Sequence, residues 1–366
     1  MQRNITIFYT NDFAGIGHIT RVLRITRGLS KINHKKTYWI ITNKCPSITK
    51  LPKNVKIIIL PKIKVNKKLK DCRYAKKISQ KANIWGSFII EHVSKKGVTL
   101  FFSDLNPNGG YGELRKVFDY LKNTDIKKVI GLRDILDTKK QTKKEWLANK
   151  EGILSIKDYD KIIVFGKQEI FKDLYWDIMP VKKISFIDPI FPVKKKVTKG
   201  ENIDIFAMFG GGKNSVEQIN YLARILPYLS LKKTVIVTGF LFPKKSYEKL
   251  KKKYPNIQFL RWTKKAPEYI SRARLTIAHC GYNSVNDVFL YSDNFLLFPR
   301  TKKGRKEQII RAQYLKEKGY CDFISMKNKK ESNVEIILTS LANRKLKKTI
   351  NASKGILELD KILKNV

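Results

Sequence analysis

The stretch His279-Cys280-Gly281-Tyr282-Asn283-Ser284 decides the fold of this chain. The apolar run Leu275–Ala278 before it is typical of a short buried strand, and Val285–Tyr291 after it is expected to form a helix. A strand, a turn of small residues and a helix start form an anion-binding site in α/β proteins. The reason is that backbone N–H groups and the positive end of the helix dipole point into the turn.

The side chains of this stretch indicate what such an anion carries. Gly281 lets a ligand approach the backbone, and Asn283 and Ser284 are good N-cap residues. Asp287, about one turn further on, is placed to accept a hydrogen bond from a sugar hydroxyl. The residues favour a phosphate with a polyol attached, as in a nucleotide. A plain turn that binds nothing is the alternative.

Length and composition allow two domains. The chain has 366 residues, of which 42% are hydrophobic, so two packed cores are expected. Its four cysteines are far apart and it has four histidines, which argues against a zinc site and a disulfide framework. There is no signal peptide and no apolar run of transmembrane length, so we expect a cytoplasmic protein.

The chain carries a net charge of +45, from 76 basic and 31 acidic residues. Such a charge attracts polyanions: nucleic acid, anionic lipid or phosphorylated substrates. The lysines are spread along the whole chain, which favours solvated surfaces, and no nucleic-acid-binding module is present, so no specific nucleic acid is expected. The candidate surface for an anionic membrane is Lys62–Lys81 with Ile84, Trp85, Phe88 and Ile89. An aromatic core under a basic face is the simpler interpretation.

The apolar pattern alternates strand and helix twice over. The first series of expected strands is Thr6–Tyr9, Thr37–Ile41, Val55–Leu60, Val98–Phe102, Val129–Leu132, Lys161–Val164 and Ile184–Ile187. After the connector Asp188–Pro192, the second series is Ile203–Met208, Thr234–Thr238, Ile257–Leu260, Leu275–Ala278 and Phe295–Phe298. Helices are expected between them, for example His18–Ser30 and Glu113–Leu121.

Alternation of this kind predicts parallel sheets covered by helices. We predict an α/β protein with two doubly wound, Rossmann-like domains that face each other across a cleft. The first spans residues 1–190 and the second residues 191–350. Residues 351–366 form a C-terminal helix that packs back toward the first domain. Ligands are expected at the carboxyl ends of the strands.

A second candidate loop is Gly15-Ile16-Gly17-His18, which follows the first expected strand and opens a helix. The glycines permit a tight turn and close approach of a ligand. His18 is a candidate general base, with a capping histidine as the alternative. Asp104 follows another expected strand and orients His18, contacts an acceptor or caps a turn. The loop lacks the third glycine of a dinucleotide fingerprint.

Two further loops are candidates. Gly210-Gly211-Gly212-Lys213 begins the second half and exposes N–H groups to a phosphate or a sugar, or is a flexible turn. Its spacing is not that of a P-loop. Glu307-Gln308, which follows Pro299-Arg300 and a basic loop, binds sugar hydroxyls or simply starts a helix.

These loops resemble those of known glycosyltransferases. His279 to Asp287 is similar to the donor-binding box of UDP-glycosyltransferases, His-Cys-Gly-Trp-Asn-Ser-x-x-Glu, with Trp262 and Glu307-Gln308 at the flanking positions. Gly15 to Arg21 resembles the acceptor-side loop of the peptidoglycan N-acetylglucosaminyltransferase and its relatives. A closer resemblance, to a family of predicted glycosyltransferases with the two-domain GT-B fold, covers nearly the whole chain. Its motifs are Gly15–Arg21, Gly131–Asp137, Gly210–Gly212, Gly281–Asn283 and Pro299–Ala312.

The resemblance implies an inverting glycosyltransferase that needs no metal or cofactor. It would move a sugar from a nucleotide-diphosphate donor, expected to be a UDP-sugar, to a hydroxyl of a glycan, lipid or small molecule. His18 would be the base, and Gly15, Gly17 and Arg21 would belong to the acceptor-side loop. On the donor side, Gly210, Gly211, Gly212 and Lys213 would stabilise the leaving group. Gly281, Tyr282, Asn283 and Ser284 would hold the diphosphate, with His279 beside them. Asp287 would contact the ribose, Arg261 and Trp262 would lie beside the base, and Glu307 and Gln308 would bind the sugar. Asp287 and Tyr282 depart from the box, which has Glu and Trp there.

Three alternatives remain open. One is a nucleotide-sugar hydrolase of the same fold, and another is a UDP-sugar 2-epimerase. The third is a non-enzymatic protein that binds polyanions through its charge. Many relatives act on cell-envelope or lipid-linked acceptors, so the resemblance also implies peripheral contact with the inner face of the membrane.

Overall fold

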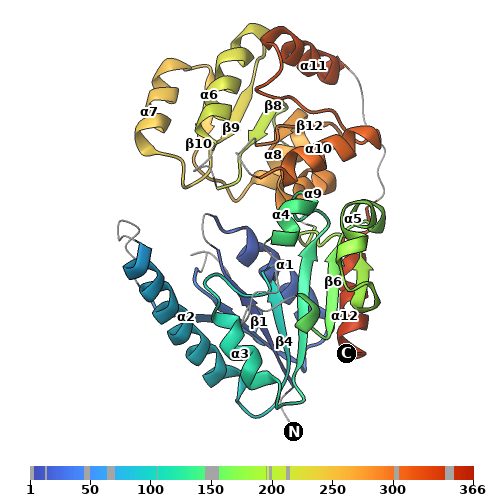
Figure 1. The fold of residues 1–366 in the computed structure, drawn as a ribbon. Helices are drawn as coiled ribbons and strands as arrows, with labels where there is room; N and C mark the ends of the chain where they lie inside the picture. Colours follow the sequence, from blue (N-terminus) through green and yellow to red (C-terminus); the bar gives the residue numbers. More distant parts are fainter. Residues whose placement is uncertain are drawn as a thin grey trace. The chain divides into compact units, whose positions relative to one another are not determined.

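The computed structural model describes residues 4–12, 15–44, 50–63, 71–104, 106–144, 156–194, 196–197, 200–211, 215–300, 305–342 and 350–366. The chain forms two compact units, which are described separately. Unit 1 consists of Met1–Ile190 and Ser353–Val366, and unit 2 of Phe191–Ala352. Each unit is an α/β domain with a parallel sheet and helices around it, as Figure 1 shows. The predicted fold class is confirmed.

Unit 1 is built on a seven-stranded sheet in the order β3-β2-β1-β4-β5-β6-β7. The strands are β1 (Ile5–Thr10), β2 (Thr37–Thr42), β3 (Val55–Ile59), β4 (Val98–Asp104), β5 (Lys127–Arg133), β6 (Lys161–Phe165) and β7 (Ile184–Ile187). β1 is buried along its whole length and rich in β-branched and aromatic residues, which suits a central strand covered on both faces. The strand order reverses between β1 and β4, because β1 pairs in parallel with both β2 and β4.

Helices of unit 1 cover the sheet. They are α1 (Gly17–Ile32), α2 (Asp71–Val93), α3 (Glu113–Leu121), the short α4 (Lys139–Thr142), α5 (Gln168–Tyr175) and α12 (Lys354–Lys364). Helices α2, α3 and α5 contribute Trp85, Val117 and Phe171 to one buried core. The helix pattern of α1 comes from buried residues at helical spacing, among them Val22 and Leu29.

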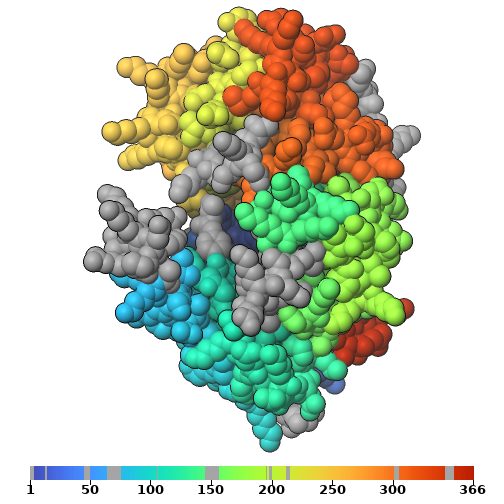
Figure 2. Space-filling model, in the orientation of Figure 1, coloured from blue at the N-terminus to red at the C-terminus, as the bar shows by residue number. Residues whose placement is uncertain are grey.

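The C-terminal helix α12 belongs to unit 1 although it follows unit 2 in the chain. The Glu358 carboxylate accepts a hydrogen bond from the backbone N–H of Asp188 at 2.7 Å, and Asn33 of α1 donates to Asp360. Gly28 of α1 lies against Ile356, with too little room there for a further carbon. In Figure 2 this red segment lies against the lime-green part of unit 1 that ends at β7.

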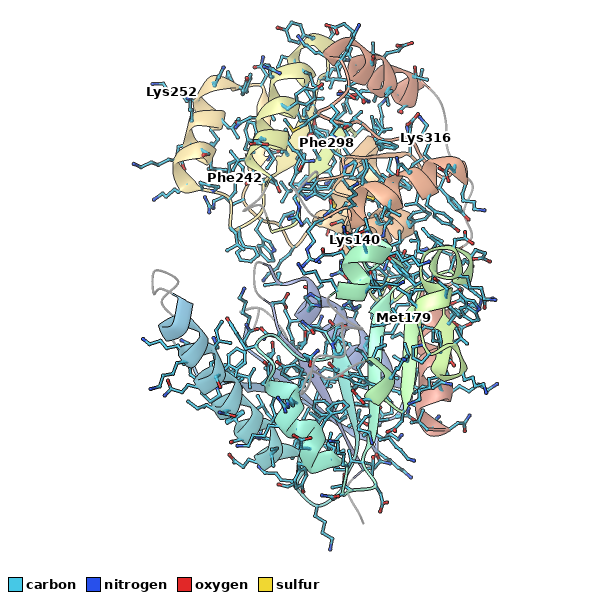
Figure 3. The ribbon with its side chains drawn as sticks, viewed as in Figure 1. Lys140, Met179, Phe242, Lys252, Phe298 and Lys316 are labelled. Atoms are coloured by element: carbon cyan, nitrogen blue, oxygen red, sulfur yellow. The ribbon has the colours of Figure 1, made fainter. Side chains whose placement is uncertain are left out.

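Unit 2 has a five-stranded parallel sheet in the order β10-β9-β8-β11-β12. The strands are β8 (Ile203–Met208), β9 (Thr234–Val237), β10 (Ile257–Leu260), β11 (Ala273–Ala278) and β12 (Phe295–Leu297). The helices are α6 (Val216–Ile225), α7 (Lys244–Lys253), α8 (Ala266–Arg272), α9 (Tyr282–Tyr291), α10 (Glu307–Glu317) and α11 (Lys330–Ala342). Here the strand order reverses between β8 and β11. Phe242 and Phe298 lie in the interior of this unit, whereas Lys252 stands at its edge (Figure 3).

Two boundaries differ from the sequence prediction in ways that matter for the site. Strand β4 continues to Asp104 itself, so this carboxylate stands on the sheet rather than in the loop after it. Helix α9 begins at Tyr282 with Gly281 as its N-cap, so the prediction that Asn283 or Ser284 caps the helix is wrong. Gly281 has the extended backbone that an N-cap needs, so the helix starts directly after it.

The proposed membrane surface is also revised. Trp85 and Ile89 are buried, and the Trp85 indole donates to the carbonyl of Pro61 at 2.9 Å. The Lys81 ammonium lies 4.3 Å from the Trp85 ring and 4.4 Å from that of Tyr111. These groups form core packing, which leaves Ile84 and Phe88 as the less buried members, and residues 64–70 lie outside the described part. In the described part, no helix has the length and apolarity to span a bilayer.

Candidate active site

Three charged or polar side chains of unit 1 meet where the strand order reverses. His18 and Arg21 lie about one turn apart on the same face of α1, and Asp104 is the last residue of β4. His18 Nδ1 lies 2.8 Å from Asp104 Oδ2. Arg21 donates from Nε to Oδ1 and from Nη2 to Oδ2 of Asp104, both at 2.8 Å. This point of a doubly wound sheet is where such proteins bind ligands.

The arrangement fixes the ionisation of Asp104. Burial alone raises the pKa of this carboxyl, but the charge of Arg21 and the hydrogen bonds from His18 and Arg21 outweigh it, so that the pKa lies below its ordinary value. The carboxylate is therefore charged at neutral pH, and it accepts a hydrogen bond from the protonated Nδ1 of His18. That tautomer leaves the lone pair on Nε2, the other ring nitrogen, and the His18 side chain is 28% exposed.

Asp12, which the sequence analysis missed, holds the start of α1. Its carboxylate accepts from the backbone N–H groups of His18 at 3.1 Å and Ile19 at 2.8 Å. The Asn43 side chain accepts a hydrogen bond from the backbone N–H of Asp12 and donates one to its carbonyl. The chain's own carboxylate therefore takes up two of the N–H groups at this helix N-terminus, where an anion is favoured. A binding role for Gly15 and Gly17 stays a prediction. An aspartate just before a glycine turn and a helix start was the available signal.

Arg21 belongs to the predicted acceptor-side motif and also to the expected helix His18–Ser30. It lies within α1, its side chain is 2% exposed, and its guanidinium forms both bonds of a fork with Asp104. These bonds position Asp104, and contact of Arg21 with a ligand stays a prediction.

His279 of unit 2 has a structural role. Its Nε2 lies 2.8 Å from Oε1 of Gln218, and the amide nitrogen of Gln218 donates to the carbonyls of Phe298 and Pro299. Burial, with a smaller effect from the charge of Arg300, lowers the pKa of His279 to about 3. The ring is therefore neutral and joins β11 to α6 and to the end of β12. The assignment of His279 to the donor-binding residues stays a prediction.

The turn after β11 is the start of α9. Gly281 is the N-cap, Tyr282 is 4% exposed, and Asn283 and Ser284 occupy the first turn at intermediate exposure. Asp287 lies in the next turn and is half-buried. A Cβ added to Gly281 would meet only the Gln308 amide nitrogen, at 3.8 Å. The backbone of this turn is thus accessible to a ligand, with the positive end of the helix dipole behind it.

Helix α10 is fastened to this turn. Arg311 donates from Nη1 to the carbonyl of Cys280 at 2.9 Å and lies 3.7 Å from Oε1 of Glu307. The Gln308 side-chain oxygen accepts from the backbone N–H of Arg300 at 2.9 Å. Gln308 therefore lies close to Gly281, and Arg311 connects Glu307 to the Cys280 carbonyl. Arg311 was named only as part of a motif, and its role as the fastening residue was missed.

The glycine loop after β8 lies beside the turn that follows β11. Gly210 has a φ of +53°, a left-handed conformation that favours glycine, and Gly211 accepts a backbone hydrogen bond from Leu241. β8 and β11 are neighbours, and the backbone N–H of His279 donates to the carbonyl of Met208. Gly212 and Lys213 lie outside the described residues.

Arg261 and Trp262 are adjacent in the chain but differ in their contacts and exposure. Arg261 donates from Nη2 to the carbonyls of Phe240 and Phe242, both at 2.9 Å, so it anchors the loop after β9. Its place beside a base stays a prediction. Trp262 follows it with 47% of its surface exposed, an aromatic face available for stacking. No cluster of three or more metal-binding side chains occurs among the residues that the structure describes.

Comparison with known proteins gives one family match and a set of similar solved structures. Residues 206–366 match the glycosyltransferase family 28 C-terminal domain. A UDP-glucosyltransferase from Polygonum tinctorium capable of glucosylating indoxyl is similar to the chain at 15% identity and a TM-score of 0.63, with 99% of each chain covered. MurG of Acinetobacter baumannii is 13% identical with a TM-score of 0.58, covering 99% of this chain and 100% of its own. UGT71G1 of Medicago truncatula, complexed with UDP-glucose, is 14% identical with a TM-score of 0.59, covering 99% and 94%.

These similarities establish the fold of the protein. At such low identities the solved structures establish the fold, which is the GT-B fold of glycosyltransferases. The match to the family 28 C-terminal domain runs from Phe206 to Val366, which is less than half of the chain. Among curated protein sequences, none matches the chain.

Proposed function

We propose that this protein transfers a sugar from a UDP-sugar to an acceptor hydroxyl, with inversion at the anomeric carbon and without a metal ion. The observation that carries the proposal is the contact of His18 with a buried, charged Asp104. The family 28 domain and the relatives that are named as UDP-glucosyltransferase or are complexed with UDP-glucose support the choice of donor.

The proposed reaction is a direct displacement. Nε2 of His18 takes the proton of the acceptor hydroxyl while that oxygen bonds to the anomeric carbon. The bond from this carbon to the diphosphate oxygen breaks, and the electron pair leaves with the UDP. Asp104 holds the Nδ1 proton and stabilises the imidazolium that forms. Attack from the side opposite the leaving group inverts the carbon, through a transition state like an oxocarbenium ion.

Unit 2 is the proposed donor-binding unit. We propose that the first turn of α9, from Gly281 to Ser284, takes the diphosphate, since helix N–H groups and the helix dipole favour an anion there. Asp287 contacts the ribose and Trp262 stacks on the base. Glu307 and Gln308, held near Gly281 by α10, bind the transferred sugar. The Gly210–Lys213 loop stabilises the leaving group as well.

The acceptor is proposed to be a hydroxyl of a cell-envelope glycan or a lipid-linked sugar at the cytoplasmic membrane face. The support is the net charge of +45, which favours anionic surfaces. Sedimentation with vesicles that contain anionic lipid, compared with neutral vesicles, tests this part. Equal recovery with both would contradict it.

A histidine pair tests the base. His18→Ala is expected to keep UDP binding, measured by thermal shift, and to lose transfer by about a hundredfold to ten-thousandfold. His34, which is exposed, provides the matched control His34→Ala, and its turnover is expected to be unchanged. Normal turnover of His18→Ala would refute the assignment. A panel of nucleotide sugars, with mass analysis of products from a cell extract, identifies the donor.

The same assay separates the alternatives. Incubation with the donor alone is expected to release little UDP and to return the sugar unchanged. Release of free UDP at full rate without an acceptor would mean a hydrolase, and a sugar altered at C2 would mean an epimerase. Full activity after treatment with a chelator is expected if no metal takes part. Asp287→Ala is expected to weaken UDP binding about tenfold, the effect of one lost charge-assisted hydrogen bond.

A further inference from the structure

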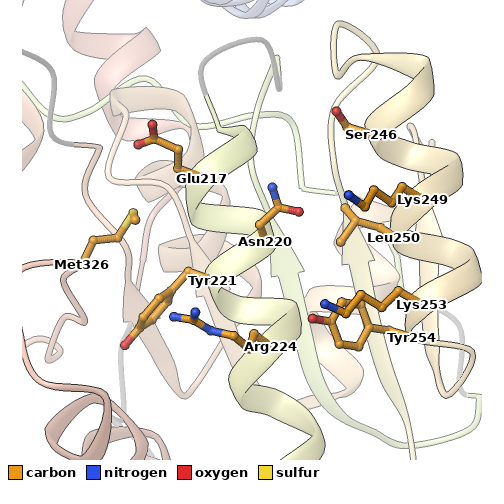
Figure 4. A pocket seen from close by; sticks show the side chains of 10 residues that line it. All are labelled: Glu217, Asn220, Tyr221, Arg224, Ser246, Lys249, Leu250, Lys253, Tyr254 and Met326. Atoms are coloured by element: carbon orange, nitrogen blue, oxygen red, sulfur yellow. The ribbon is translucent and has the colours of Figure 1, made fainter.

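A groove lies between α6 and α7 of unit 2, with a volume of about 520 Å³. Figure 4 shows the side chains that line it: Glu217, Asn220, Tyr221, Arg224, Ser246, Lys249, Leu250, Lys253, Tyr254 and Met326. None of them belongs to the proposed donor-binding residues. A volume of this size suits a small molecule and is too small for a folded partner.

The groove is built by two helix faces that oppose each other. The residues from α6 recur at helical spacing from Glu217 to Arg224, and those from α7 recur in the same way from Ser246 to Lys253. Each helix therefore presents one continuous stripe to the groove. This makes the lining a property of both helices rather than a chance gap in a loop.

The base of the groove is apolar and rigid. Tyr221 is 9% exposed and Leu250 is 4% exposed. The hydroxyl of Tyr221 is fixed by the Asn333 side-chain amide, which donates to it at 2.6 Å. Tyr254 adds a second aromatic ring from the end of α7. Aromatic walls of this kind bind the flat or apolar body of a ligand.

The rim of the groove is cationic. Arg224 stands over the Tyr221 ring at 5.6 Å, and Lys253 over the Tyr254 ring at 5.5 Å. Lys249 and Lys253 extend from α7 toward α6 in Figure 4. Against three cations the lining has one carboxylate, that of Glu217, and no ion pair joins it to any of the three in the described part of the chain. The groove lining therefore has a net positive charge, which the single carboxylate of Glu217 balances only in part.

We propose that this groove binds a small phosphate monoester whose body is a ring. The doubly charged phosphate lies between Arg224 of α6 and the two lysines of α7, and the ring lies on Tyr221, Leu250 and Tyr254. A phosphate matches cations that arrive from both walls better than a singly charged carboxylate does, because it offers more charge and more acceptor oxygens. This site is separate from the proposed donor site and does not depend on the transfer reaction.

The test compares two double variants of α7 that remove the same charge. Lys249→Gln with Lys253→Gln empties the groove rim, whereas Lys251→Gln with Lys252→Gln removes two lysines that do not line the groove. Phenyl phosphate is titrated into each full-length protein by calorimetry, with phenol and benzoate as the probes without a phosphate. Thermal unfolding and UDP binding are measured alongside, to confirm that each variant is folded.

We expect phenyl phosphate to bind at least about tenfold more weakly to the Lys249/Lys253 variant, and with nearly normal affinity to the Lys251/Lys252 variant. Arg224→Gln is expected to weaken binding in the same way from the opposite wall. Equal weakening in both double variants would mean that only the overall charge attracts the probe, and would overturn the proposal. Benzoate that binds as tightly as phenyl phosphate would overturn the phosphate assignment. UDP binding that stays normal in all variants separates this result from the test of the donor site.

Discussion

The guanidinium of Arg21 and the carboxylate of Asp104 form a two-point ion pair inside unit 1, with both N–O distances at 2.8 Å. The two side chains are 2% and 0% exposed. Oδ2 of Asp104 also lies 2.8 Å from Nδ1 of His18. The orientation of His18, the proposed base, therefore depends on Arg21 through a carboxylate that both share.

Arg21→Met is expected to destabilise the protein by about 3–5 kcal/mol, because it leaves the buried charge of Asp104 unpaired. Arg21→Lys retains the charge but loses the planar fork, so a smaller loss is expected. Urea unfolding measures both. If Arg21→Met were as stable as the unchanged protein, the ion pair would not hold this part of unit 1 together.

Arg21→Lys also tests the positioning of His18. We expect transfer to fall with little change in UDP binding, and the pH profile of turnover to shift, because the carboxylate next to His18 loses its fixed geometry. A purely structural role of Arg21 would lower the amount of folded protein without altering the pH profile.

His279 predicts a pH dependence of stability. Its pKa is about 3 in the folded protein and near 6.5 when unfolded, so the unfolded chain binds an extra proton between these values. Stability is therefore fully present above about pH 6.5 and decreases as the pH falls toward 3, by up to about 1.4 kcal/mol per pH unit. His279→Gln is expected to remove this slope between pH 5 and 6.5, measured by urea unfolding. The exposed His34→Gln is the control, and an equal slope in the His279 variant would contradict the prediction.

Much of the fold is predictable from the sequence because the strands are buried on both faces. Runs such as Ile203–Met208 are continuous in apolar residues, and each is followed by a turn and a helix, so periodicity alone reveals the alternation. Element ends were less certain. The polar Asp104 is typical of a loop, yet it is the last residue of β4. It can be buried there because Arg21 supplies the opposite charge.

The site was predictable only in part, because its connections link residues far apart in the chain. The Gly-x-Gly-His turn and the stretch around Gly281 have local signatures. Gln218, which binds His279, and Arg311, which binds the Cys280 carbonyl, have none, since each meets its partner only after the sheet has formed. Local chemistry therefore located the loops, whereas it could not tell which of their side chains face a ligand and which serve the interior.

Trp262 and Arg261 are adjacent in the chain, but their variants are expected to behave differently. Trp262 is 47% exposed, so Trp262→Ala should leave stability nearly unchanged and weaken UDP binding about tenfold, through loss of base stacking. Arg261→Ala removes two hydrogen bonds to the loop that contains Phe240, so it should lower the melting temperature. Calorimetric titration of UDP and thermal unfolding separate the two effects. Normal UDP affinity in Trp262→Ala would exclude stacking on this ring.

Gly355 tests how α12 is attached to unit 1. Replacement of a helical glycine by alanine ordinarily stabilises a protein by about 0.5–1 kcal/mol, and the φ of Gly355 is not in the left-handed region. Here the added Cβ would collide with the backbone carbonyl of Asp188 and lie 3.0 Å from that of Pro189, atoms that cannot move aside as a side chain can. We therefore expect Gly355→Ala to destabilise the protein by about 1–3 kcal/mol, the reverse of the ordinary sign.

The control for this prediction is Lys361→Ala on the exposed face of the same helix, which should change the free energy of unfolding by less than about 0.5 kcal/mol. Gly28→Ala meets the side chain of Ile356 instead of backbone. Its cost should therefore fall when Ile356 is shortened to Val, whereas no side-chain change relieves Gly355→Ala. A stabilised Gly355→Ala protein would mean that α12 is not packed against the Asp188–Pro189 segment in solution, because only that contact opposes the helix-forming preference of alanine.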